Sequence, residues 1–149
     1  MMKLTAKAKL QIRKPVDVVF DAIANPDHLT GYFISKSSGP MKEGQELIWE
    51  FGDFPGSFPV KVTTLKTNEL ITFVWDPETQ VDIQLQANGE GNTIVSVSEG
   101  EKELNEQNLK WLISNTSGWA NFLDCLKAYL EYGIRLRDGA YDYMKPKNQ

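Results

Sequence analysis

The stretch from Ser117 to Gly133 constrains the fold of this chain more than any other part of its sequence. Large apolar residues recur there at helical spacing, and these are Trp119, Phe122, Leu123, Leu126 and Leu130. Gly133 follows them, and glycine readily adopts the left-handed conformation at which many helices end. The pattern predicts a long helix with one apolar face, which has to be buried against another element.

The sequence before this helix predicts an antiparallel sheet. Apolar and polar residues alternate from Leu4 to Ile12, which is the period of a half-buried strand. Pro15 then begins a short helix that ends near Ala24, and the Asn25-Pro26 pair separates it from a second short helix. From residue 43 to residue 99, alternating segments are separated by short turns rich in glycine, proline and asparagine. Consecutive strands on short turns indicate an antiparallel meander.

These elements predict an α+β fold in which a curved sheet of about six strands covers the apolar face of the long helix. The 149 residues fit one domain, so we expect a single domain over residues 1–149. The long helix is expected from about Glu106 to Tyr132, after Asn105 as its N-cap. Residues 114–118 are poor helix formers, so a kink or a break into two helices is an open alternative there.

Charge and cysteine content exclude several classes of function. The formal net charge is −4, which argues against a general binder of nucleic acid or of anionic membranes. The single cysteine cannot form an intramolecular disulfide, and no segment has the pattern of a signal peptide or a membrane span. We therefore expect a cytoplasmic protein.

Residues that could carry catalysis are few. The only histidine, His28, is predicted to be an exposed turn residue, and Cys125 beside the apolar stripe is predicted to be a small buried apolar residue. No spacing suits a metal site, and no glycine-rich loop suits a nucleotide, so we expect no metal and no cofactor. The strand acids Asp82 and Glu50 are expected to point outward, and Glu99 is expected at a strand end.

Two motifs give the chain a resemblance to a known family. One is IRKPVDVVFDAI at residues 12–23, followed by NPDHLTGYF at residues 25–33. The other is Gly118-Trp119, followed by Leu123, Leu126, Leu130 and Glu131 on the same helix. In this order the motifs resemble the START and birch-pollen-allergen superfamily (SRPBCC), and within it the homologues of the activator of heat-shock-chaperone ATPase.

The resemblance implies the helix-grip fold, with two short helices after the first strand and a pocket between the sheet and the long helix. Relatives bind apolar small molecules there, and the positions carried over to the pocket are Phe33, Trp49, Phe58, Trp75, Trp119, Phe122, Leu123 and Leu126. Aromatic residues at this spacing also form ordinary cores, so a filled interior without a ligand is the alternative.

Three hypotheses about function follow from the resemblance. The first is a non-enzymatic binding domain for an apolar or amphipathic small molecule. The second is an interaction module that regulates a heat-shock chaperone, and the third is a cyclase-like or hydrolase-like enzyme that uses an acid in the pocket. Residues 133–149 are rich in large side chains, and we expect this extension to pack on the domain or on a partner subunit. In the second case the extension could pair across the two-fold axis of a homodimer.

Overall fold

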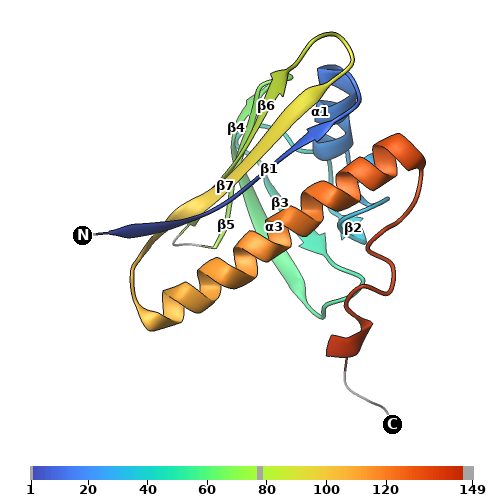
Figure 1. The fold of residues 1–149 in the computed structure, drawn as a ribbon. Helices are drawn as coiled ribbons and strands as arrows, with labels where there is room; N and C mark the ends of the chain where they lie inside the picture. Colours follow the sequence, from blue (N-terminus) through green and yellow to red (C-terminus); the bar gives the residue numbers. More distant parts are fainter. Residues whose placement is uncertain (1, 77–78, 146–149) are drawn as a thin grey trace.

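The computed structural model describes residues 2–76 and 79–145 (Figure 1). The turn expected at residues 77 and 78, and the last four residues of the expected extension, lie outside this part. The elements in chain order are β1 (Lys3–Ile12), α1 (Val16–Ala24), α2 (Pro26–Leu29), β2 (Lys36–Ser37), β3 (Glu46–Glu50), β4 (Ser57–Lys66), β5 (Leu70–Asp76), β6 (Thr79–Ala87), β7 (Thr93–Glu103), α3 (Glu106–Tyr132) and a 3-10 turn (Asp142–Met144).

The strands form one antiparallel sheet in the order β1-β7-β6-β5-β4-β3-β2. The first strand pairs with the last one along its whole length, from Lys3 opposite Glu103 to Ile12 opposite Thr93. Strand β2, for which the sequence analysis predicts no strand, pairs with β3, so the described sheet has seven strands where about six were expected. The α+β helix-grip fold is confirmed.

Helix α3 begins and ends where the sequence predicts. The Asn105 side chain accepts a hydrogen bond from the backbone N–H of Asn108 at 2.7 Å, and Gly133 ends the helix at a φ of 67°. The helix is continuous through residues 114–118, so the break considered for this stretch does not occur. Although α3 has 27 residues, neither it nor any other helix in the described part of the chain is apolar enough to span a membrane.

The long helix lies across the sheet and packs against β1 and β7 (Figure 1). Its buried residues belong to the second half of the helix, from Trp119 to Ala128. In the first half, Leu109 and Ile113 are exposed. The C-terminal half of α3 therefore closes the core, whereas the N-terminal half leaves space between itself and the sheet.

Candidate ligand-binding cavity

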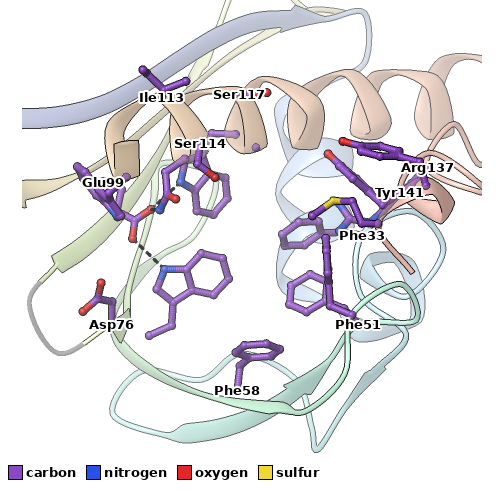
Figure 2. Close-up of a pocket in the computed structure, with 18 residues that line it drawn as sticks. Phe33, Phe51, Phe58, Asp76, Glu99, Ile113, Ser114, Ser117, Arg137 and Tyr141 are labelled. Atoms are coloured by element: carbon purple, nitrogen blue, oxygen red, sulfur yellow. Dashed lines mark hydrogen bonds between the residues drawn. The ribbon is translucent and has the colours of Figure 1, made fainter. Parts of the chain in front are cut away.

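A cavity of about 710 Å³ lies between the sheet, the middle of α3 and the segment that follows α3 (Figure 2). This segment, residues 134–145, is called the strap below. Nine of the lining residues are aromatic, namely Phe33, Phe51, Phe54, Phe58, Trp75, Trp111, Trp119, Tyr141 and Tyr143. The other lining residues are Asp76, Glu99, Ile113, Ser114, Asn115, Ser117, Gly118, Arg137 and Met144. Binding sites for small molecules commonly combine such an apolar wall with a few polar groups.

The structure divides the eight pocket positions carried over from the resemblance into two groups. Four of them line the cavity, namely Phe33, Phe58, Trp75 and Trp119. The other four, Trp49, Phe122, Leu123 and Leu126, are buried in the core behind this wall. The apolar stripe of α3 begins with Trp119 at the cavity, and its continuation further along the helix packs in the core.

The aromatic wall is held by ring-to-ring contacts. Trp75 and Trp119 lie with their ring centroids 5.4 Å apart, and Phe33 contacts Phe51 edge to face at 5.2 Å. The core ring of Phe122 supports Phe33 from behind at 4.7 Å. Rigid rings supported in this way form a wall whose shape does not depend on a ligand.

Glu99 is the only buried charged residue in the described part of the chain. Its Oε1 accepts hydrogen bonds from Asn115 Nδ2 at 2.8 Å and Trp119 Nε1 at 2.9 Å. Its Oε2 accepts a hydrogen bond from Trp75 Nε1 at 3.0 Å (Figure 2) and another from Thr79 Oγ1 at 2.9 Å. The two oxygens of a carboxylate offer about four lone-pair positions, so these four donors occupy its acceptor capacity. One side chain thereby ties α3 to three strands.

The expectation that Glu99 lies at a strand end is wrong. Strand β7 continues to Glu103, and Glu99 lies inside it on the same face as Val95 and Val97. The other two strand acids considered in the sequence analysis do not line the cavity: Glu50 is exposed, and Asp82 accepts a hydrogen bond from Thr72 Oγ1 at 2.6 Å. Of these three acids Glu99 is the one that the fold brings to the site, where Asp76 at the end of β5 is a second lining acid.

Comparison with known proteins identifies the family. The sequence profile of the activator of Hsp90 ATPase homolog 1-like proteins matches residues 13–131. The chain belongs to this family. A comparison with curated proteins found no significant match.

Solved structures share the fold of this Hsp90-activator-like chain. Protein SSP2350 from Staphylococcus saprophyticus is 28% identical with a TM-score of 0.80, over 90% of this chain and 96% of that one. DynU16, a protein of the dynemicin biosynthetic locus, is 25% identical with a TM-score of 0.76, and the match covers 87% of this chain but only 48% of DynU16. The Aha1 dimer from Colwellia psychrerythraea is 21% identical with a TM-score of 0.74, over 89% and 98% of the two chains.

The strap lies beyond the segment that matches the Hsp90-activator-like family, yet it supplies one wall of the cavity. Arg137 forms an ion pair with Asp53, with Nε 2.7 Å from Oδ2 and Nη2 3.2 Å from Oδ1. Arg135 donates a hydrogen bond to the carbonyl oxygen of Thr30 at 3.0 Å. Tyr141 packs on Phe54 with ring centroids 5.5 Å apart. These contacts attach the described part of the extension to its own domain.

Trp111 is a lining residue that the sequence reading missed. It precedes Asn115 and Trp119 at intervals of four residues, so helical spacing alone places the three side chains on one face of α3. Its Nε1 is buried and has no hydrogen-bond partner among the described residues, and Lys102 Nζ lies 5.1 Å from the ring centroid. A buried donor without a partner costs about 1–3 kcal/mol. A movement that brings an acceptor within hydrogen-bonding distance of Trp111 Nε1 would recover this free energy.

The reactive residue types lie away from the cavity. His28 is in α2 and only partly exposed, contrary to the exposed turn residue we expected, and its Nδ1 lies 2.8 Å from the Tyr129 hydroxyl. Cys125 is buried with a free thiol, and burial raises its pKa. The described residues contain no group of three His, Cys, Asp or Glu that could hold a metal ion.

Proposed function

We propose that the protein binds a small apolar or amphipathic molecule in the cavity between the sheet and α3, without catalysing a reaction. The observation that carries this proposal is a space of about 710 Å³ whose aromatic wall is fixed by Glu99 and by ring packing. Its size is within the range of about 300–1,000 Å³ that is usual for small-molecule sites. The family and the fold support the proposal, since relatives of this kind bind apolar ligands.

A fluorescence titration with the neutral probe N-phenyl-1-naphthylamine tests this function. We expect saturable enhancement of probe fluorescence in the unmodified chain, because the probe enters an apolar cavity. The blocking variant is Gly118→Trp: Gly118 lines the cavity, and a Cβ atom there would have no atom within 4 Å. An indole at this position fills part of the space and should weaken binding at least about ten-fold.

The matched control for the blocking variant is Gly91→Trp. Gly91 lies in the turn between β6 and β7, has the same open surroundings and does not line the cavity. We expect its probe affinity to equal that of the unmodified chain. Failure of the unmodified chain to bind the probe, or equal loss in both variants, would refute the proposal.

Two acids line the cavity, Glu99 and Asp76, so the enzymatic alternative depends on one of them. The carboxylate of Asp76 is paired with Lys102 Nζ at 3.2 Å. A general acid or base has to reach a proton of the substrate within hydrogen-bonding distance. Both oxygens of Glu99 already accept two hydrogen bonds each, so a substrate would first have to displace Thr79 or Asn115. The arrangement therefore favours a structural role for this carboxylate over proton transfer.

Interaction with a heat-shock chaperone remains the second candidate function because the family carries that activity in its description. Its test is copurification with the chaperone followed by an ATPase assay, in which a stimulated rate would support it.

A homodimer is a further proposal, and the name of the Colwellia psychrerythraea structure describes that protein as a dimer. Light scattering measures the mass in solution. The buried free thiol of Cys125 suits a reducing compartment, and we propose the cytoplasm.

A further inference from the structure

Arg137 sits in surroundings that resemble a binding site for a cation. Its guanidinium carbon lies 5.4 Å from the ring centroids of both Phe33 and Phe51 and 5.9 Å from that of Phe54. The carboxylate of Asp53 contacts the guanidinium through both oxygens, and the two side chains are only 12% and 15% exposed. Aromatic faces combined with a carboxylate are the groups that recognise ammonium and guanidinium ions. We call Phe33, Phe51, Phe54 and Asp53 the cage.

The cage belongs to the domain, whereas its occupant belongs to the strap. Within the strap, the described backbone hydrogen bonds that begin at Asp138 or later are all local, for example Ala140 N to Arg137 O at 2.9 Å. The described hydrogen bonds between the strap and the rest of the domain are made by the side chains of Arg135 and Arg137 and, at the start of the strap, by the backbone N–H of Ile134, which donates to Ala128 O at 3.4 Å. Such a segment can leave the domain without breaking any strand or helix.

The cage and the cavity are continuous. Phe33, Phe51 and Phe54 line the cavity and also surround Arg137 (Figure 2 labels the first two of these rings and Arg137). Arg137 is the only basic residue among the residues that line the cavity, and Asp76 and Glu99 are the acidic ones. When the strap is displaced, Asp53 loses its pairing with Arg137 and joins these two carboxylates, of which Asp76 is paired with Lys102 at 3.2 Å. The opened site is therefore negatively charged.

We propose that Arg137 is a built-in occupant of a cation site, and that the ligand is an amphipathic organic cation whose head group displaces Arg137 from the cage. The head is an ammonium or guanidinium group held by Asp53 and the rings of Phe33, Phe51 and Phe54. The tail extends along the same wall toward Trp75 and Trp119. This inference rests on the proposed binding function and adds the charge of the ligand and the way in which the site opens.

The test uses two probes with the same tail and opposite charge, decyltrimethylammonium and decanoate, both below their micellar concentrations. Calorimetry measures their affinities for the unmodified chain, for Arg137→Ala and for Arg135→Ala as the matched control. Arg135→Ala removes an equal charge from the strap but leaves the cage occupied, since Arg135 is half-exposed and contacts Thr30 and Asp138 instead.

We expect Arg137→Ala to bind decyltrimethylammonium at least about ten-fold more tightly than the unmodified chain, because the cation no longer competes with the guanidinium. Its affinity for decanoate should not increase. Arg135→Ala frees the strap contact with Thr30 but leaves Arg137 in the cage, so it should raise the affinity for the cation by less than Arg137→Ala does. Adding Asp53→Asn to Arg137→Ala should abolish the gain. Equal gains for both probes, or no gain for the cation, would overturn the proposal.

A second measurement needs no variant and holds even if Arg137→Ala does not fold. Hydrogen exchange of the unmodified chain is followed with and without decyltrimethylammonium, and the amides of residues 134–145 should exchange faster with the cation present. Decanoate should cause no such change. Unchanged exchange with the cation, whether or not it binds, overturns the proposal. If the neutral probe still binds while the cation does not move the strap, the cavity function stands and only the cation site is refuted.

Discussion

The substitution Glu99→Gln tests the central hydrogen-bond arrangement of the site with almost no change in volume. Glutamine keeps one acceptor oxygen but replaces the other with an amide group that only donates. An indole N–H also only donates, and Trp75 and Trp119 bond to different oxygens of Glu99. Whichever way the amide is turned, one buried indole donor faces another donor.

The expected cost follows from that unpaired donor. A buried polar group that loses its partner costs about 1–3 kcal/mol, and the exchange of a charged for a neutral acceptor weakens the remaining bonds further. Relief from burying a charge offsets part of this loss. We therefore expect Glu99→Gln to lower the free energy of unfolding by about 2 kcal/mol, which corresponds to about 4–8 °C in Tm for a domain of this size.

Urea denaturation followed by tryptophan fluorescence measures this loss, and the indole N–H resonances of Trp75 and Trp119 report the broken bond. The control is Asp82→Asn, which changes a partly exposed strand acid whose partners are the hydroxyl of Thr72 and the exposed side-chain amide of Gln80. A hydroxyl can donate or accept, so this control should cost less than about 1 kcal/mol. A Glu99→Gln variant as stable as the unmodified chain would refute the reasoning.

Two further predictions concern α3. Gly118→Ala should stabilise the chain by about 0.5–1 kcal/mol in urea denaturation, because alanine is the better helix former and its Cβ meets no atom within 4 Å; the matched change Gly133→Ala should destabilise it, since φ is 67° there. The second prediction concerns Glu131, whose burial raises its pKa, but whose hydrogen bonds from Lys127 and the backbone N–H of Arg13 outweigh burial and lower the pKa overall. The stability that Glu131 contributes is present above the unfolded pKa of about 4.3 and is lost as the pH falls through the lower folded value. Denaturation at several pH values should therefore show Glu131→Gln to be less stable than the unmodified chain near pH 7. A difference in unfolding free energy that persists at the lowest pH would contradict this.

Local periodicity was sufficient to predict the frame of the fold. The alternation of β1 and the spacing of the stripe in α3 are properties of the elements themselves, so the sequence identified both. Strand β2 was missed because its two residues, Lys36 and Ser37, are too few to show a period, and only their pairing with β3 makes them a strand. Local sequence also could not decide whether α3 is continuous, because residues 114–118 are poor helix formers. Tertiary hydrogen bonds from Asn115 and Trp119 to Glu99 stabilise the helix across this stretch.

Glu99 shows why the site was harder to predict than the fold. Gly100 and the charged residues after it look like a linker, so the strand was expected to end there. In the fold Gly100 lies opposite Thr5, and a Cβ at position 100 would be 2.8 Å from Thr5 Oγ1. This glycine is therefore required by a contact with the other end of the chain. Arg137 was missed for a similar reason, because its contacts with Asp53 depend on the tertiary path of the strap.

The position of Glu99 also explains how a cavity of this size persists in a chain of 149 residues. Apolar walls on either side of a cavity tend to close on each other, because closure removes apolar surface from water. If Trp75 or Trp119 moved inward, its indole N–H would lose the hydrogen bond to the buried carboxylate of Glu99. Those bonds therefore hold both rings at the cavity wall. The polar group that suggested an enzyme therefore acts as the support of the cavity, and its loss should reduce ligand binding and stability together.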